Sequence, residues 1–189
     1  MTSIAYLSVR RGGRVTGAVY LAYFVLAIGA QALAGHVPPA LSAAANVVAA
    51  VCYAALVVLL FGVFLPESPT RSAIAALFGI AGCVVTILAL VHALPVRVTP
   101  LWFFGPYCAL VGYLIVVSGF VPRALGALLM LAGFAWLAFA AGVLPPPATR
   151  AAEALGIVAE AALMLWLLAA GIDVARWNAR IAQGPGGAP

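Results

Sequence analysis

Six apolar runs, each about 20 residues or longer, constrain what this chain can fold into. They cover residues 15–35, 41–65, 72–94, 101–121, 122–144 and 151–174. A run of this length crosses a bilayer as an α-helix, because lipid offers no partners for backbone polar groups. The sequence therefore predicts an all-α, polytopic membrane helix bundle with six transmembrane helices. A short N-terminal segment (1–14) precedes the transmembrane domain (15–174), and a cytoplasmic, partly disordered tail (175–189) follows it.

The low charge content excludes a soluble domain. Only 7% of the residues are charged, whereas soluble domains carry about 25%. The chain could not cover a water-facing surface, and the lipid bilayer is its expected partner. All nine basic residues are Arg, and they stand in short loops without interleaved aromatic residues. We therefore expect no nucleic acid partner.

Prolines separate the runs, and the arginines predict their direction. With both termini in the cytoplasm, the inner arginines are Arg10, Arg11, Arg14, Arg71, Arg123, Arg176 and Arg180, and the outer ones are Arg97 and Arg150. This imbalance follows the positive-inside rule and predicts a multi-pass protein with N-in, C-in topology. Cleavage of a signal peptide after residues 32–34 is the alternative. The first run is longer than the 7–15 residues usual for a signal sequence, so a retained span is favoured.

Three stretches resemble one bacterial membrane family. The central one, GYLIVVSGFVPRALG at residues 112–126, carries most of the resemblance, and residues 14–21 and 156–171 match the ends of the family pattern. The chain thus resembles the uncharacterised family catalogued as domain of unknown function 4386. The resemblance implies a six-helix integral membrane protein with no assigned chemistry. We expect the protein in the bacterial inner (cytoplasmic) membrane.

Glu160 is the main candidate functional residue because it lies deep in the last run. A charge inside the bilayer costs about 2.5–3.5 kcal/mol on insertion scales, so an intramembrane acid suggests a site. Ala152 and Gly156 precede Glu160 at helical spacing and Glu153 lies seven residues before it, which places all four on one inward face. The alternative is a hydrogen-bonded structural acid.

Other polar residues are expected in the same outer half of the membrane. The candidate ligand-binding residues are Glu160, Glu153, Gln31, Asn46 and Tyr107. Hydrogen bonding between helices is the alternative role for Gln31 and Asn46, and packing is the alternative for Tyr107. His36 and His92 are candidate metal or haem ligands, although loop histidines are common. The three cysteines form no CxxC pair and indicate neither a disulfide nor a metal motif.

Three functional classes remain open. We favour a small-ligand binding or transport module with an outward-facing polar cavity around Glu160, which would suit a cationic or proton-coupled ligand. A structural or assembly subunit with a membrane-protein partner, or a homo-oligomer, is the alternative, motivated by seams of small residues. A haem- or metal-binding redox protein is the second alternative. An enzyme is disfavoured because no catalytic set is recognisable, and the sequence leaves any cofactor unknown.

Overall fold

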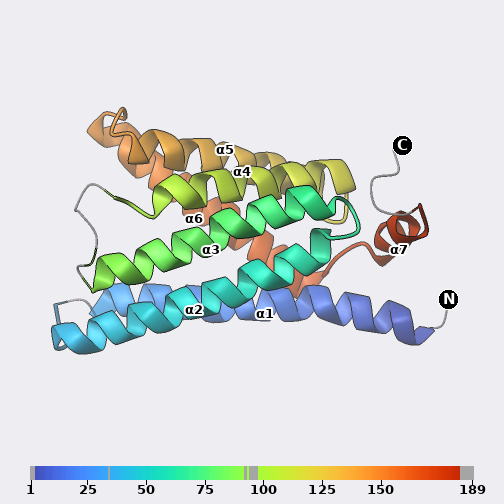
Figure 1. Cartoon of the computed structure of the whole chain (residues 1–189), viewed down its shortest axis with the longest axis horizontal. Coiled ribbons are helices and arrows are strands. Elements are labelled where there is room, and N and C mark those ends of the chain that lie inside the picture. The colour runs from blue at the N-terminus through green and yellow to red at the C-terminus, as the bar shows by residue number, and fades with distance from the viewer. Residues whose placement is uncertain (1–2, 34, 92, 94–97, 184–189) are drawn as a thin grey trace.

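The computed structural model describes residues 3–33, 35–91, 93 and 98–183, and these residues form seven α-helices (Figure 1). They are α1 (Ser3–Leu33), α2 (Pro39–Phe64), α3 (Pro69–Leu90), α4 (Leu101–Ser118), α5 (Arg123–Ala140), α6 (Pro146–Ala169) and α7 (Val174–Gln183). Within this described part, α1 from Arg11 onward and α2 to α6 are long and apolar enough to cross a membrane. The predicted all-α bundle of six spans is confirmed, and the chain is an integral membrane protein in contact with the lipid bilayer.

The six long helices close into a ring. Each helix packs against the next one in the chain, and α6 packs back against α1. The start of α1 lies at the same end of the bundle as α7, on the right in Figure 1. We call this the terminal end; it includes the turns at residues 65–68 and 119–122. The opposite end, which contains the connections after Leu33, Leu90 and Ala140, is called the distal end.

Glycines allow the closest helix pairs to form. A Cβ atom added to Gly112 of α4 would lie 2.5 Å from the carbonyl oxygen of Gly126 in α5, and one added to Gly126 would lie 2.6 Å from that of Gly112. A Cβ atom added to Gly17 of α1 would likewise lie 2.5 Å from the backbone nitrogen of Leu168 in α6. Small residues permit this approach in lipid, where packing rather than the hydrophobic effect joins helices. Gly126 of α5 is therefore used in a contact within the chain.

The turn between α4 and α5 is tight. Gly119 ends α4 with a left-handed backbone (φ 63°), and its N–H bonds to the carbonyl of Ile115. Glycine adopts this conformation without steric cost. Pro122 then precedes the first residue of α5 with a φ of −52°, so the chain reverses within a few residues.

The last spanning helix begins earlier than predicted. α6 starts at Pro146 and ends at Ala169, whereas the sequence placed a break at 145–147 and the span at 151–174. Proline is tolerated in the first turn of a helix, because an N–H there would have no intrahelical partner. Glu160 consequently lies about 21 Å from the start of its helix, at 1.5 Å per residue. This places it nearer the middle of the bundle than the outer half that the sequence predicted.

Candidate functional site

The Glu160 carboxylate points into the bundle, where two other helices supply hydrogen-bond donors. Tyr20 Oη in α1 donates to Glu160 Oε2 at 2.9 Å. Cys108 Sγ in α4 donates to Glu160 Oε1 at 3.8 Å. Ala152 and Gly156 on the same face of α6 are buried, as their helical spacing predicts. One carboxylate therefore joins α1, α4 and α6 near the middle of the membrane-spanning region.

Aromatic rings surround this carboxylate. Tyr53 of α2 is at the centre of the group, with its ring centroid 4.6 Å from that of Tyr23, 5.1 Å from Phe104 and 6.0 Å from Tyr107, in edge-to-face geometries. Tyr20 contacts the same ring at 6.4 Å. Edge-to-face pairs are the favoured arrangement of aromatic side chains. The cluster fixes the positions of rings contributed by α1, α2 and α4.

A cavity of about 650 Å³ extends from Glu160 toward the distal end. Its lining comes from all six long helices and the segment before α4: Tyr23, Phe24, Ala27, Ile28, Gln31, Asn46, Ala49, Ala50, Tyr53, Thr86, Pro100, Leu101, Phe104, Trp136, Ile157 and Glu160. Between the Tyr23 and Gln31 levels of α1 the cavity runs about 12 Å along the helix. Its volume is within the range of small-molecule sites.

Three of the five predicted ligand-binding residues meet at this cavity. Glu160, Gln31 and Asn46 all line it. Asn46 Nδ2 donates to the carbonyl of Ser42, one turn earlier in its own helix, at 2.8 Å. The interhelical bond that was the alternative role for Asn46 is therefore not the one observed. The first and second spans thus bring their amides to the part of the cavity farthest from the carboxylate.

The other two predicted residues do not line the cavity. Glu153 has the same helical direction as Glu160 within about 20°, but it is exposed, because it lies about 10 Å nearer the helix start. Tyr107 is buried and lines a narrow space on the terminal side, together with Ser72 of α3. Neither the Tyr107 hydroxyl nor the Ser72 hydroxyl has a hydrogen-bond partner among the described residues.

The candidate metal ligands gain no partners in the described part of the chain. His36 lies exposed in the turn after α1. His92 lies outside the described residues. Among the residues that are described, no three His, Cys, Asp or Glu side chains gather closely enough to hold a metal ion. The cysteines are free thiols, and Cys108 contributes to the Glu160 contact instead.

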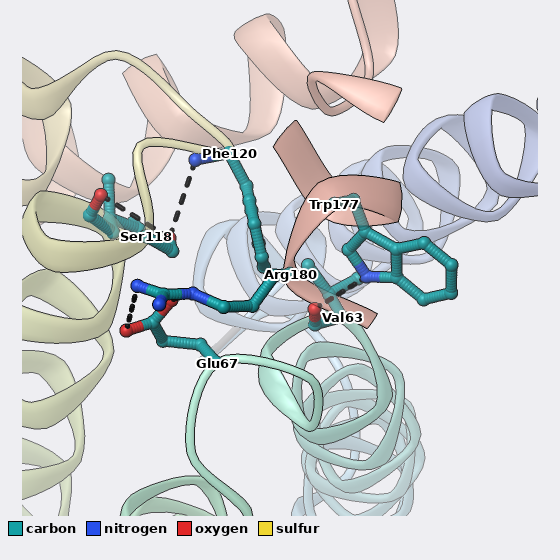
Figure 2. A network of polar contacts seen from close by, with 7 residues as sticks. Val63, Glu67, Ser118, Phe120, Trp177 and Arg180 are labelled. Carbon is teal, nitrogen blue, oxygen red and sulfur yellow. Dashed lines mark hydrogen bonds and ion pairs between the residues drawn. The ribbon is translucent and has the colours of Figure 1, made fainter. Parts of the chain in front are cut away.

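A second polar network lies at the terminal end, and the sequence analysis missed it. Figure 2 shows Arg180 of α7 beside Glu67, which lies in the turn between α2 and α3. Arg180 Nε donates to Glu67 Oε2 at 2.7 Å and Arg180 Nη2 donates to Oε1 at 3.0 Å. Glu67 is only 8% exposed. This is a buried, two-point ion pair between the short last helix and a loop.

Two further contacts hold α7 against the bundle. Trp177 Nε1 donates to the carbonyl of Val63 at 3.0 Å (Figure 2). The backbone N–H of Asp173 donates to the carbonyl of Phe120 at 2.8 Å, and Asp173 Oδ1 accepts from the N–H of Arg176 at the start of α7. The acidic residue one position before the helix is the local signal that could have predicted α7. The fixed helix covers both turns of the terminal end.

Comparison with known proteins supports the resemblance seen in the sequence. The family described as Domain of unknown function (DUF4386) matches residues 98–171, which confirms the resemblance over less than half of the chain. The matched segment contains α4, α5, α6 and Glu160, whereas Tyr20, Gln31 and Asn46 lie outside it. No curated protein and no solved structure matches the chain.

Proposed function

We propose that the chain is a small-ligand binding or transport module of the bacterial inner membrane. Its site is the cavity that extends from Glu160 toward the distal end. The observation that carries this proposal is the convergence of Glu160, Gln31 and Asn46 on one cavity of about 650 Å³. Gln31 and Asn46 lie in the first two helices and Glu160 lies in the sixth, so the closed ring of helices is what brings them together. Ligand sites in bundles lie between helices in this way.

The direction of access follows from the arginines. The terminal end carries Arg14, Arg71, Arg123 and Arg176, and the positive-inside rule therefore favours cytoplasmic termini. The cavity then opens toward the outside of the cell. In this orientation, a molecule that enters from outside would pass the amides of Gln31 and Asn46 before it reached Glu160.

The carboxylate keeps the capacity to bind a ligand. Its two oxygens accept from Tyr20 and Cys108, but a carboxylate offers about four lone-pair sites. Glu160 is half-buried rather than fully buried, because one side of it faces the cavity. A purely structural acid would require no such opening.

The assembly alternative receives less support from the packing. Its motivation was the seams of small residues, and these seams are occupied within the chain. Gly79 packs against Val57 and Tyr107, while Gly133 packs against Gly105 and Ala109. The close-packing surfaces are thus used to close the ring.

Native mass spectrometry of the protein purified in mild detergent tests the proposal. We expect a reproducible extra small-molecule mass on the natural chain. Ala50→Phe, which fills the cavity, should abolish it, whereas Val51→Phe should retain it, because Val51 is 57% exposed on the outer face of α2. A chain without added mass, or a mass kept by both variants, would contradict the proposal. A bound protein subunit would favour the assembly alternative.

A further inference from the structure

We infer that the ligand of this cavity is a hydrophobic organic cation, with an ammonium group at Glu160 and an apolar body that extends toward the distal end. The inference rests on the proposed function and adds the chemical class of the ligand. Three features of the cavity carry it: the charge at its base, the rings beside that charge and the apolar wall above them.

The charge is carried by one residue. Among the described lining residues, Glu160 alone is acidic and none is basic. Unpaired charge is expensive in an apolar environment, so a group that approaches this carboxylate is favoured when it is positive. Among the described residues, none forms an ion pair with Glu160, whose hydrogen-bond donors are the neutral side chains of Tyr20 and Cys108. The positive partner is therefore available to come from a ligand.

The aromatic rings favour an organic ammonium over a bare metal ion. Tyr23, Tyr53, Phe104 and Trp136 all line the cavity together with Glu160. Ring faces attract cations, and sets of rings are the usual way in which proteins bind quaternary ammonium groups. A hard metal ion would instead need about six oxygen ligands. Near the base of this cavity, the carboxylate is accompanied by rings and aliphatic side chains.

The wall above the rings fits an apolar body. Ala27, Ala49, Ala50 and Ile157 form much of it. The amides of Gln31 and Asn46 appear only at the far end, about 12 Å from the Tyr23 level. A ligand that fits therefore has its charge at one end and an apolar skeleton about 10 Å long behind it. This length follows from the distance along α1 between the Tyr23 and Gln31 levels. A small inorganic cation bound at Glu160 would not contact this apolar wall.

A matched pair of probes tests the inference. The first is phenylpropyltrimethylammonium, and the second is its neutral isostere with tert-butyl in place of the trimethylammonium group. Equilibrium binding is measured on the full chain in nanodiscs, with empty nanodiscs subtracted. We expect the cation to bind roughly tenfold more tightly than the isostere, because a desolvated contact between a cation and an aromatic ring strengthens binding by about that factor. Glu160→Gln should remove most of this preference.

Two further variants keep the test decisive. Glu153→Gln makes the same change on the same helix at an exposed position, and it should leave the preference intact. Tyr23→Leu retains the carboxylate while removing one ring, and it should reduce the preference several-fold even if Glu160→Gln folds poorly.

Equal binding of both probes, or a preference that survives Glu160→Gln, would overturn the cationic class. Saturable binding in those cases would leave the proposed function standing. Absence of saturable cation binding also overturns the inference, and the native mass measurement then decides the proposed function separately.

Discussion

The Tyr20 hydroxyl and the Glu160 carboxylate meet at 2.9 Å across 140 positions of sequence. The bond joins the first spanning helix to the last, at the place where the ring closes. It also holds Glu160 at the base of the cavity and directs Oε2 toward α1. This contact therefore contributes both to closing the fold and to orienting the candidate site.

Replacing Tyr20 by Phe should destabilise the protein by about 1–2 kcal/mol, because it removes the hydrogen bond from a buried hydroxyl to the half-buried Glu160 carboxylate. Tyr107→Phe is the matched control, since it makes the same change at a buried tyrosine whose hydroxyl has no partner among the described residues. That variant should be neutral or slightly stabilising. Thermal unfolding in detergent measures both. Equal losses for the two variants would contradict the assigned role of Tyr20.

Arg180→Met should cost about 3–5 kcal/mol, because it leaves the buried Glu67 carboxylate without its partner. The double substitution Glu67→Met and Arg180→Met should recover most of that loss, because no buried charge then remains. Unfolding by denaturant in detergent gives the free energies. Failure of the double variant to recover would show that Arg180 acts through other contacts.

Arg176→Met is the control for this ion pair, since it lies on the same helix. Its partner is Asp173 at 3.2 Å, and both side chains are about half exposed. An exposed pair contributes about 0–1 kcal/mol. We therefore expect a large difference between the two arginines of α7.

Gly126→Ala should destabilise the α4–α5 pair by about 1–3 kcal/mol, because the added methyl group would meet the carbonyl oxygen of Gly112. Gly62→Ala is the control within α2, where nothing lies within 4 Å of the new Cβ. It should be neutral or stabilise by up to about 1 kcal/mol, through helix propensity. A comparable loss at both positions would mean that the close approach of α4 and α5 is not what Gly126 provides.

The orientation can be measured by thiol labelling in a background whose three cysteines are replaced by alanine. His36→Cys lies at the distal end and is exposed, so an impermeant maleimide should label it in intact cells. Thr70→Cys lies at the terminal end and is also exposed, and it should react only after permeabilisation. The reverse pattern would place the termini outside and the cavity opening in the cytoplasm.

The sequence predicts the spans well because their cause is local. Run length and proline position suffice to place helices when backbone groups must be satisfied within each helix. The orientation of Glu160 was likewise accessible, since Gly156 one turn earlier indicates a packed face. The sequence does not give the depth of Glu160 correctly, because a run of prolines is typical of a break, whereas Pro146 and Pro147 form the first turn of α6.

The missed features depend on contacts between distant segments. Glu67 stands between two prolines and has the appearance of an ordinary loop acid, while its partner Arg180 comes 113 residues later. Nothing within either segment indicates the other. Tyr107 is a similar case. The helical period gives the direction of its side chain, but it does not say whether the residue lines the Glu160 cavity or the narrow space beside Ser72. Cys108 gave no signal at all, since a buried thiol usually behaves as a small apolar residue.

The closed ring also has a consequence for biosynthesis. Chains emerge from the ribosome N-terminus first, so α1 enters the membrane with the Tyr20 hydroxyl and must wait for five further spans before its acceptor arrives. α6 is inserted last and carries the acidic residue that insertion disfavours, but by then Tyr20 and Cys108 are already in the bilayer to receive it. The cavity is therefore complete only after α6 has been inserted, and a nascent chain that stops before α6 contains the rings without the acid.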